Sequence, residues 1–90
     1  MYKSNPNILI EDTSDAEVIM HNRDNKNTIV LNYTAKILYE SFVNNEYAEG
    51  IKQYLNKAGE IFNISISELE EDAKTTLEKL VRNNVLIEEV

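Results

Sequence analysis

The sequence predicts an α+β domain in which three short antiparallel strands are followed by three helices. Up to Leu31, apolar residues come in short runs that are separated by polar turns, as in strands. After Asn32, apolar residues recur every three to four positions, as on one face of a helix. The 90 residues contain no linker, repeat or low-complexity tract, so we expect one domain over 1–90 with a single modest core.

The three strands are expected near residues 8–12, 16–21 and 28–32. Each contains a short apolar run, and the third run is rich in β-branched residues. The segments between the runs, 11–15 and 22–27, are rich in Asp, Asn and Ser, which tolerate the conformations of tight turns. Short strands joined by such turns are typical of an antiparallel meander or hairpin.

The three helices are expected near residues 33–44, 46–60 and 66–83. Asn32 precedes the first helix, and its side-chain oxygen can accept a hydrogen bond from a free backbone N–H of the first turn. Ser65 and Glu68 form the capping-box pattern, in which each side chain bonds the other residue's backbone N–H. This pattern marks the start of the third helix.

Several small or polar residues interrupt or end these helices. Gly50 lies inside the second helix, where glycine weakens a helix by about 1 kcal/mol relative to alanine. Gly59 could end that helix, although the apolar pair 61–62 could prolong it by a turn. The pair Asn83–Asn84 can stop the third helix, because Asn accepts the left-handed conformation. The apolar tail 85–87 is then expected to fold back.

The charge of the chain argues against nucleic acid as a partner. The net charge is −7 and the isoelectric point is about 4.6, whereas nucleic-acid binders usually present a basic surface. The negative charge is concentrated in the last third of the chain. It can be read as a solvated helix face that aids solubility, or as an acidic rim for a partner with Lys or Arg residues.

The sequence offers little material for catalysis or metal binding. There is no cysteine, and His21 is the only histidine. Glu70, Glu71 and Asp72 are consecutive on a helix, so their side chains do not face one another as an acid–base pair. No phosphate-binding, dinucleotide or zinc-protease motif is present. We therefore expect a protein that is not an enzyme and that has no cofactor or metal of its own.

The chain also lacks a membrane signal. No stretch approaches the roughly 20 apolar residues that span a bilayer, and the N-terminus shows no apolar signal region. We expect a cytoplasmic protein without a membrane partner, as a monomer or a weak dimer.

A sheet of three strands leaves an edge strand whose backbone groups are unpaired. Such an edge can bind a guest peptide as an additional strand, with guest side chains entering neighbouring pockets. From architecture alone, the favoured interpretation is that Thr28–Leu31 simply pairs and packs, with no guest.

Several segments of the sequence together resemble the PqqD family. Residues 28–38 resemble its strand that leads through Leu-Asn and a hydroxyl residue into an aliphatic helix. The family's closing segment consists of an acidic helix, paired leucines and an apolar tail. It resembles residues 64–72, Leu77, Leu80 and 84–87 of this chain. The resemblance spans about residues 8 to 88. The family often has Gly where Asn84 stands.

The resemblance implies a winged-helix recognition element for ribosomally made, post-translationally modified peptides. A precursor's leader peptide would join the third strand as a fourth strand, in a cleft against the third helix. A partner, commonly a radical SAM enzyme, would then modify the precursor. Asp72 or the nearby Glu68 would pair with a basic leader residue. Carried onto this sequence, the cleft would be formed by Thr28, Ile29, Val30, Leu31, Leu69, Asp72, Ala73, Thr76 and Leu80.

Two other functions remain open. A winged-helix DNA-binding regulator has the same fold class, but it would need a basic recognition helix, and the helices here are acidic or neutral. A structural subunit could instead scaffold an enzyme without touching its substrate. That alternative differs from peptide recognition only in whether the isolated domain binds the peptide.

Overall fold

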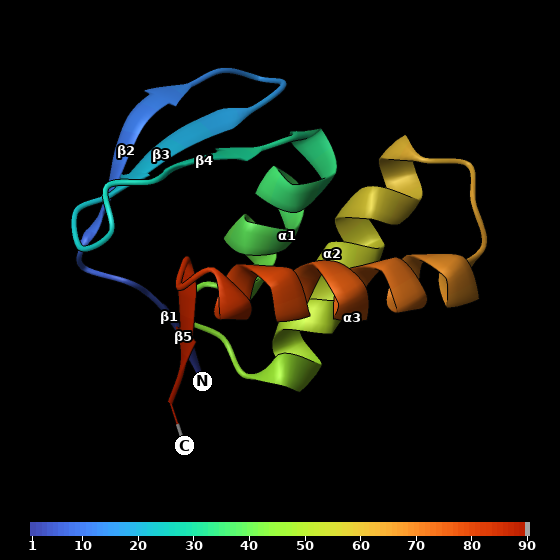
Figure 1. Cartoon of the computed structure of the whole chain (residues 1–90). Helices are drawn as coiled ribbons and strands as arrows, with labels where there is room; N and C mark the ends of the chain where they lie inside the picture. Colours follow the sequence, from blue (N-terminus) through green and yellow to red (C-terminus); the bar gives the residue numbers. More distant parts are fainter. Residues whose placement is uncertain (90) are drawn as a thin grey trace.

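The computed structural model describes residues 1–89 except for the side chain of Asp12, and Figure 1 shows how their elements are arranged. Strands β2, β3 and β4 form a sheet on one side of the three helices, and β1 and β5 lie side by side near the two termini. The predicted three antiparallel strands followed by three helices are therefore confirmed. The elements are β1 Tyr2–Ser4, β2 Ile8–Thr13, β3 Val18–Asn22, β4 Thr28–Leu31, α1 Tyr33–Phe42, α2 Tyr47–Ile61, α3 Ile66–Arg82 and β5 Leu86–Glu88.

The three-stranded sheet is an antiparallel meander with β3 in the middle. Val18 pairs with Leu31 and Met20 pairs with Ile29 across β3 and β4. Val18, Met20 and Leu31 are buried on one face of the sheet, because alternate residues of a strand point to the same side. This face packs toward the helices and forms one wall of the core.

The second, two-stranded sheet was not predicted. β1 pairs with β5 in antiparallel register, from Tyr2 opposite Glu88 to Ser4 opposite Leu86. The Glu89 N–H donates to the carbonyl of Met1 at 2.7 Å, which brings both ends of the described chain together. The expected order βββααα therefore gains one short strand at each end. Strands of three residues carry too little sequence alternation to be predicted, and their partners here lie more than eighty positions apart.

Side-chain caps fix the starts of α1 and α3, although of the two bonds of the predicted capping box the described residues show only the one that Ser65 accepts. Asn32 Oδ1 accepts from the Ala35 N–H at 2.9 Å, and Ser65 Oγ accepts from the Glu68 N–H at 3.3 Å. Each bond satisfies a backbone donor that has no partner within the helix. The cap on α1 matters most for function, because it sets the point where β4 ends and the chain turns into the helix.

Two asparagines supply the left-handed turns after helices. Asn44 has φ 65° in the connection from α1 to α2, and Asn84 has φ 59° after α3. Asn tolerates this conformation better than most residues other than glycine. Asn84 thus performs the conformational role of glycine, as expected. A third residue with positive φ, Lys26 at 62°, lies in the β3–β4 turn, where the sequence pointed to Asn and Asp.

Helix α2 runs through Gly59 to Ile61, so Gly59 does not end it. Gly50 is buried in the same helix and lies against the ring of Phe42 from α1. The close packing of α1 and α2 at this point depends on the absence of a side chain. Gly50 therefore serves packing, which propensity alone does not indicate.

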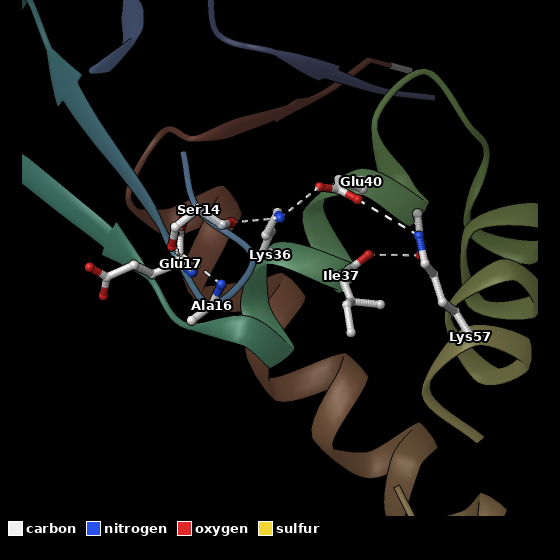
Figure 2. Close-up of polar contacts among 8 residues, drawn as sticks. Ser14, Ala16, Glu17, Lys36, Ile37, Glu40 and Lys57 are labelled. Carbon is white, nitrogen blue, oxygen red and sulfur yellow. Dashed lines mark hydrogen bonds and ion pairs between the residues drawn. The ribbon is translucent and has the colours of Figure 1, made fainter. Parts of the chain in front are cut away.

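A chain of polar contacts joins the sheet to the helices (Figure 2). Lys36 Nζ of α1 donates to the carbonyl of Ser14 in the β2–β3 turn at 2.9 Å. Glu40 Oε1 lies 4.0 Å from Lys36 Nζ, and Glu40 Oε2 lies 3.9 Å from Lys57 Nζ of α2. Exposed ion pairs of this kind contribute only about 0.2–1 kcal/mol each. The ion pairs lie within α1 and between α1 and α2, and the hydrogen bond from Lys36 to Ser14 is the contact that ties the β2–β3 turn to α1.

Candidate functional site

The free edge of β4 presents unpaired backbone groups. The N–H of Asn22 donates to the carbonyl of Asn27 at 2.9 Å where the β3–β4 turn closes. In an antiparallel pair, residues that bond across the ladder alternate with residues whose N–H and C=O point away. Asn27 bonds to β3, so Ile29 and Leu31, which follow at intervals of two, also direct their backbone groups toward β3. The backbone groups of the residues between them, Thr28 and Val30, point away from β3. These two residues offer two donors and two acceptors at the edge.

The other edge of the sheet is less suited to pairing. β2 carries a register shift between Ile10 and Asp12, so Glu11 is an additional residue in that strand. Such a bulge bends the strand and disrupts the row of backbone groups, which is a common way to protect a sheet edge from further pairing. The β3–β4 register is regular over its whole length. β4 is therefore the edge of this sheet without a bulge.

A groove separates β4 from α3 and has the start of α1 at its base. Its wider part has a volume of about 530 Å³ and its narrower part about 180 Å³. The two parts are continuous, because both are lined by Val30, Ala35, Thr76 and Lys79. The wider part is also lined by Asn32, Thr34, Asp72 and Thr75. The narrower part is also lined by Ile29, Leu31, Leu80, Asn83 and Val85.

The residues predicted for the cleft fall into three positions. Most line the groove: Ile29, Val30, Leu31, Asp72, Thr76 and Leu80. Thr28 lies on β4 with its side chain exposed, and its backbone groups lie on the free edge. Leu69 and Ala73 are 1% and 0% exposed and belong to the core. They lie on the stripe of α3 that packs inward with Leu77, which is next to the stripe that faces the groove.

Sequence reasoning missed part of the groove. The stripe of α3 that lines it is Asp72, Thr76, Lys79 and Asn83, spaced by three or four positions. Extending the spacing from Asp72 along one helix face would have found Lys79 and Asn83. The remaining missed residues come from the α1 cap and first turn, from α3 and from the segment before β5: Asn32, Thr34, Ala35, Thr75 and Val85.

Two opposite charges face this groove. Asp72 and Lys79 are both exposed, and neither side chain has an ion-pair or hydrogen-bond partner among the side chains and backbone groups that the structure describes. Charged side chains without a partner are available to bind a ligand in the groove. The two walls therefore combine backbone hydrogen-bonding groups on β4 with separated charges on α3.

A buried hydroxyl lies close to the acidic end of the groove. Tyr54 of α2 is fully buried, and its hydroxyl has no hydrogen-bond partner in the described part of the chain. Burial, and to a smaller extent the Asp72 carboxylate, raises the pKa of Tyr54 above its ordinary value of 10.0. An unsatisfied buried polar group costs about 1–3 kcal/mol.

Replacing Tyr54 with phenylalanine is expected to raise the free energy of unfolding by about 1 kcal/mol, because the buried hydroxyl has lost its hydrogen bonds to water and has gained none in the protein.

The same variant should also change how stability depends on pH, because the folded state of the original chain holds the Tyr54 proton more tightly than the unfolded state does. Tyr54 therefore adds no pH dependence to the free energy of unfolding below about pH 10, and its contribution falls as the pH rises above that value. Tyr54→Phe should lose less stability in that range. Urea unfolding at neutral and alkaline pH measures both effects, and a variant that is less stable at pH 7 would contradict this account.

Tyr2 also contributes to the alkaline loss and remains in that variant. Burial raises the pKa of Tyr2, and Glu88, Tyr47 and Glu46 add to the shift in that order. The difference between the original chain and Tyr54→Phe therefore isolates Tyr54.

Among residues 1–89, apart from the side chain of Asp12, no three Asp, Glu or His side chains lie together in a way that could hold a metal ion. No helix there is long and apolar enough to cross a membrane.

One solved structure shares this fold over nearly the whole chain. It is TbiB1 in complex with the TbiA(beta) leader peptide, with a TM-score of 0.78, 12% sequence identity and coverage of 98% of both chains. At this identity the similarity establishes the fold: three antiparallel strands and three helices arranged as in that peptide-bound protein. No protein-family model matches the chain, and no curated protein matches it in sequence. Membership of the PqqD family therefore stays a prediction.

Proposed function

We propose that this chain binds the leader segment of a ribosomally made precursor peptide as an added strand on β4 and presents it to a modifying enzyme. The observation that carries the proposal is the free edge of β4, which has no bulge and at which Thr28 and Val30 direct their backbone groups outward. A guest strand paired there would lie along the groove lined by α3. Backbone pairing would supply affinity and register, and the groove would select side chains.

The shared fold supports the peptide as ligand. TbiB1 was solved in complex with a leader peptide, and we extend that class of ligand to this chain. The PqqD-like order of segments points to a radical SAM enzyme as the partner. The domain itself would carry no catalysis and would remain in the cytoplasm with the enzyme that it serves.

DNA recognition is a weaker alternative. The exposed face of α3 carries Glu68, Glu70, Glu71 and Asp72 in its first half. Most of the affinity for the phosphate backbone comes from Lys and Arg, and this helix would repel that backbone along half its length. Peptide binding needs no such basic surface.

The function is tested with a leader probe. The genes next to that of this chain are searched for one that encodes a short precursor peptide, and the N-terminal segment of that peptide is synthesised with a fluorescent label. Fluorescence anisotropy should show saturable binding with a Kd in about the micromolar range or tighter, and mixed-sequence duplex DNA should not compete. Binding of duplex DNA with no binding of the leader probe would favour the regulator instead. Binding of neither would leave scaffolding as the better account.

A further inference from the structure

The two unpaired charges of the groove lie at different places along it. Asp72 lines only the wider part, together with Asn32 and Thr34 at the end of β4 and the start of α1. Lys79 also lines the narrower part, together with Ile29. Glu68, four positions before Asp72 on α3, adds negative charge at the same end. The groove is therefore acidic near the end of β4 and basic near its beginning.

This polarity has a defined direction relative to the strand. β4 and α3 run in opposite directions across Figure 1, in agreement with the order in which their residues line the groove. A guest strand antiparallel to β4 therefore runs in the same direction as α3. Its N-terminal part passes Asp72 first and its C-terminal part reaches Lys79 afterwards.

An antiparallel guest is the orientation that the edge favours. Thr28 and Val30 each direct both backbone groups outward, so each can exchange two hydrogen bonds with one guest residue. Antiparallel pairing is also slightly more stable per residue than parallel pairing. The sheet β2–β3–β4 would continue its meander with a fourth antiparallel strand.

We infer that this groove selects a leader segment in which a Lys or Arg precedes an Asp or Glu by two or four positions. The inference rests on the proposed function. The seven positions from Asp72 to Lys79 span about 10 Å along a helix, and about three strand residues cover that distance. Side chains on one face of the guest alternate, so spacings of two or four place both charges toward α3. The cation pairs with Asp72 and the anion with Lys79.

The test selects binders from a displayed library of random peptides of roughly 12 residues, long enough to add one strand with flanks. The library is panned on the original chain and on Asp72→Lys/Lys79→Glu, in which the polarity of the groove is reversed. The control is Glu71→Lys/Lys74→Glu, which makes the same exchange at two exposed positions of α3 outside the groove. Net charge is the same in all three proteins, and thermal unfolding checks that each is folded.

Peptides selected on the original chain should carry the basic residue before the acidic one, and those selected on the reversed chain should carry the opposite order. The reversed chain should bind the original peptides about tenfold more weakly at low salt, and the control should change affinity less than about twofold. Selected peptides that lose binding to Val30→Pro but show no charge order would overturn the inference and leave the proposed function standing. A library with no binders, or with binders indifferent to Val30→Pro, would overturn both.

Discussion

Replacing Val30 with proline is expected to weaken binding of the leader probe at least about tenfold while the domain stays folded. Proline removes the outward N–H of Val30 and puts its ring where the guest strand would pair. The lost hydrogen bond accounts for about 0.5–1.5 kcal/mol, and the displaced guest loses further contacts, so the sum exceeds the 1.4 kcal/mol that corresponds to tenfold. Val30 is 56% exposed on an edge strand, a place where sheets tolerate proline.

Two matched variants separate the backbone effect from other causes. Val30→Ala keeps the N–H and should weaken binding much less than proline does. Ile29→Pro removes an N–H that points to β3, opposite Met20, and should instead destabilise the fold. Isothermal titration and thermal unfolding of the three variants measure both quantities. Equal effects of alanine and proline at position 30 would show that the side chain, and not the strand edge, binds the peptide.

Alanine at the two glycines of α2 is expected to change stability in opposite directions. A Cβ at Gly50 would lie 2.6 Å from Phe42 Cε1 and closer still to Phe42 Cδ1. That ring cannot move away, because it is fully buried and packs at 5.6 Å from the ring of Tyr2 and 5.8 Å from that of Tyr47. Overpacking of this kind costs about 1–3 kcal/mol. Gly50→Ala should therefore destabilise the domain despite its better helix propensity.

Gly59→Ala is the matched control in the same helix. Nothing lies within 4 Å of a Cβ at Gly59, so no steric clash opposes the gain in helix propensity. That gain should raise the free energy of unfolding by about 0.5–1 kcal/mol. Each kcal/mol moves the melting temperature of a domain of this size by about 4–8 °C. Calorimetry should thus find a lower melting temperature for Gly50→Ala and a higher one for Gly59→Ala. Two shifts upward would mean that α1 and α2 are less tightly packed than described.

The sequence predicted the elements whose signals are local. The polar turns delimited the strands, and Asn32 and Ser65 marked the starts of α1 and α3 through their side chains. Asn84 was identified as the left-handed residue after α3, with the observed φ of 59°. Each of these features depends on a few neighbouring residues, so the chain order alone contains the information.

The sequence did not predict what depends on distant partners. β1 and β5 are too short to show a pattern, and Gly50 is explained by a ring eight positions earlier on another helix. In the site, the apolar stripe of α3 drew attention to Leu69 and Ala73, which face the core. The orientation of a helix relative to a groove depends on packing, and for that reason Lys79 was missed while Asp72 was found.

The exchange of backbone amides with water tests the central claim most directly. In the free chain, the amides of Thr28 and Val30 should exchange with water within a second, whereas those of Ile29 and Leu31, which pair with β3, should not. Saturation with the leader probe should stop the rapid exchange at Thr28 and Val30 and leave the other two as they were. If both amides still exchange rapidly while the probe is bound, the peptide does not add a strand to β4, and the account is wrong.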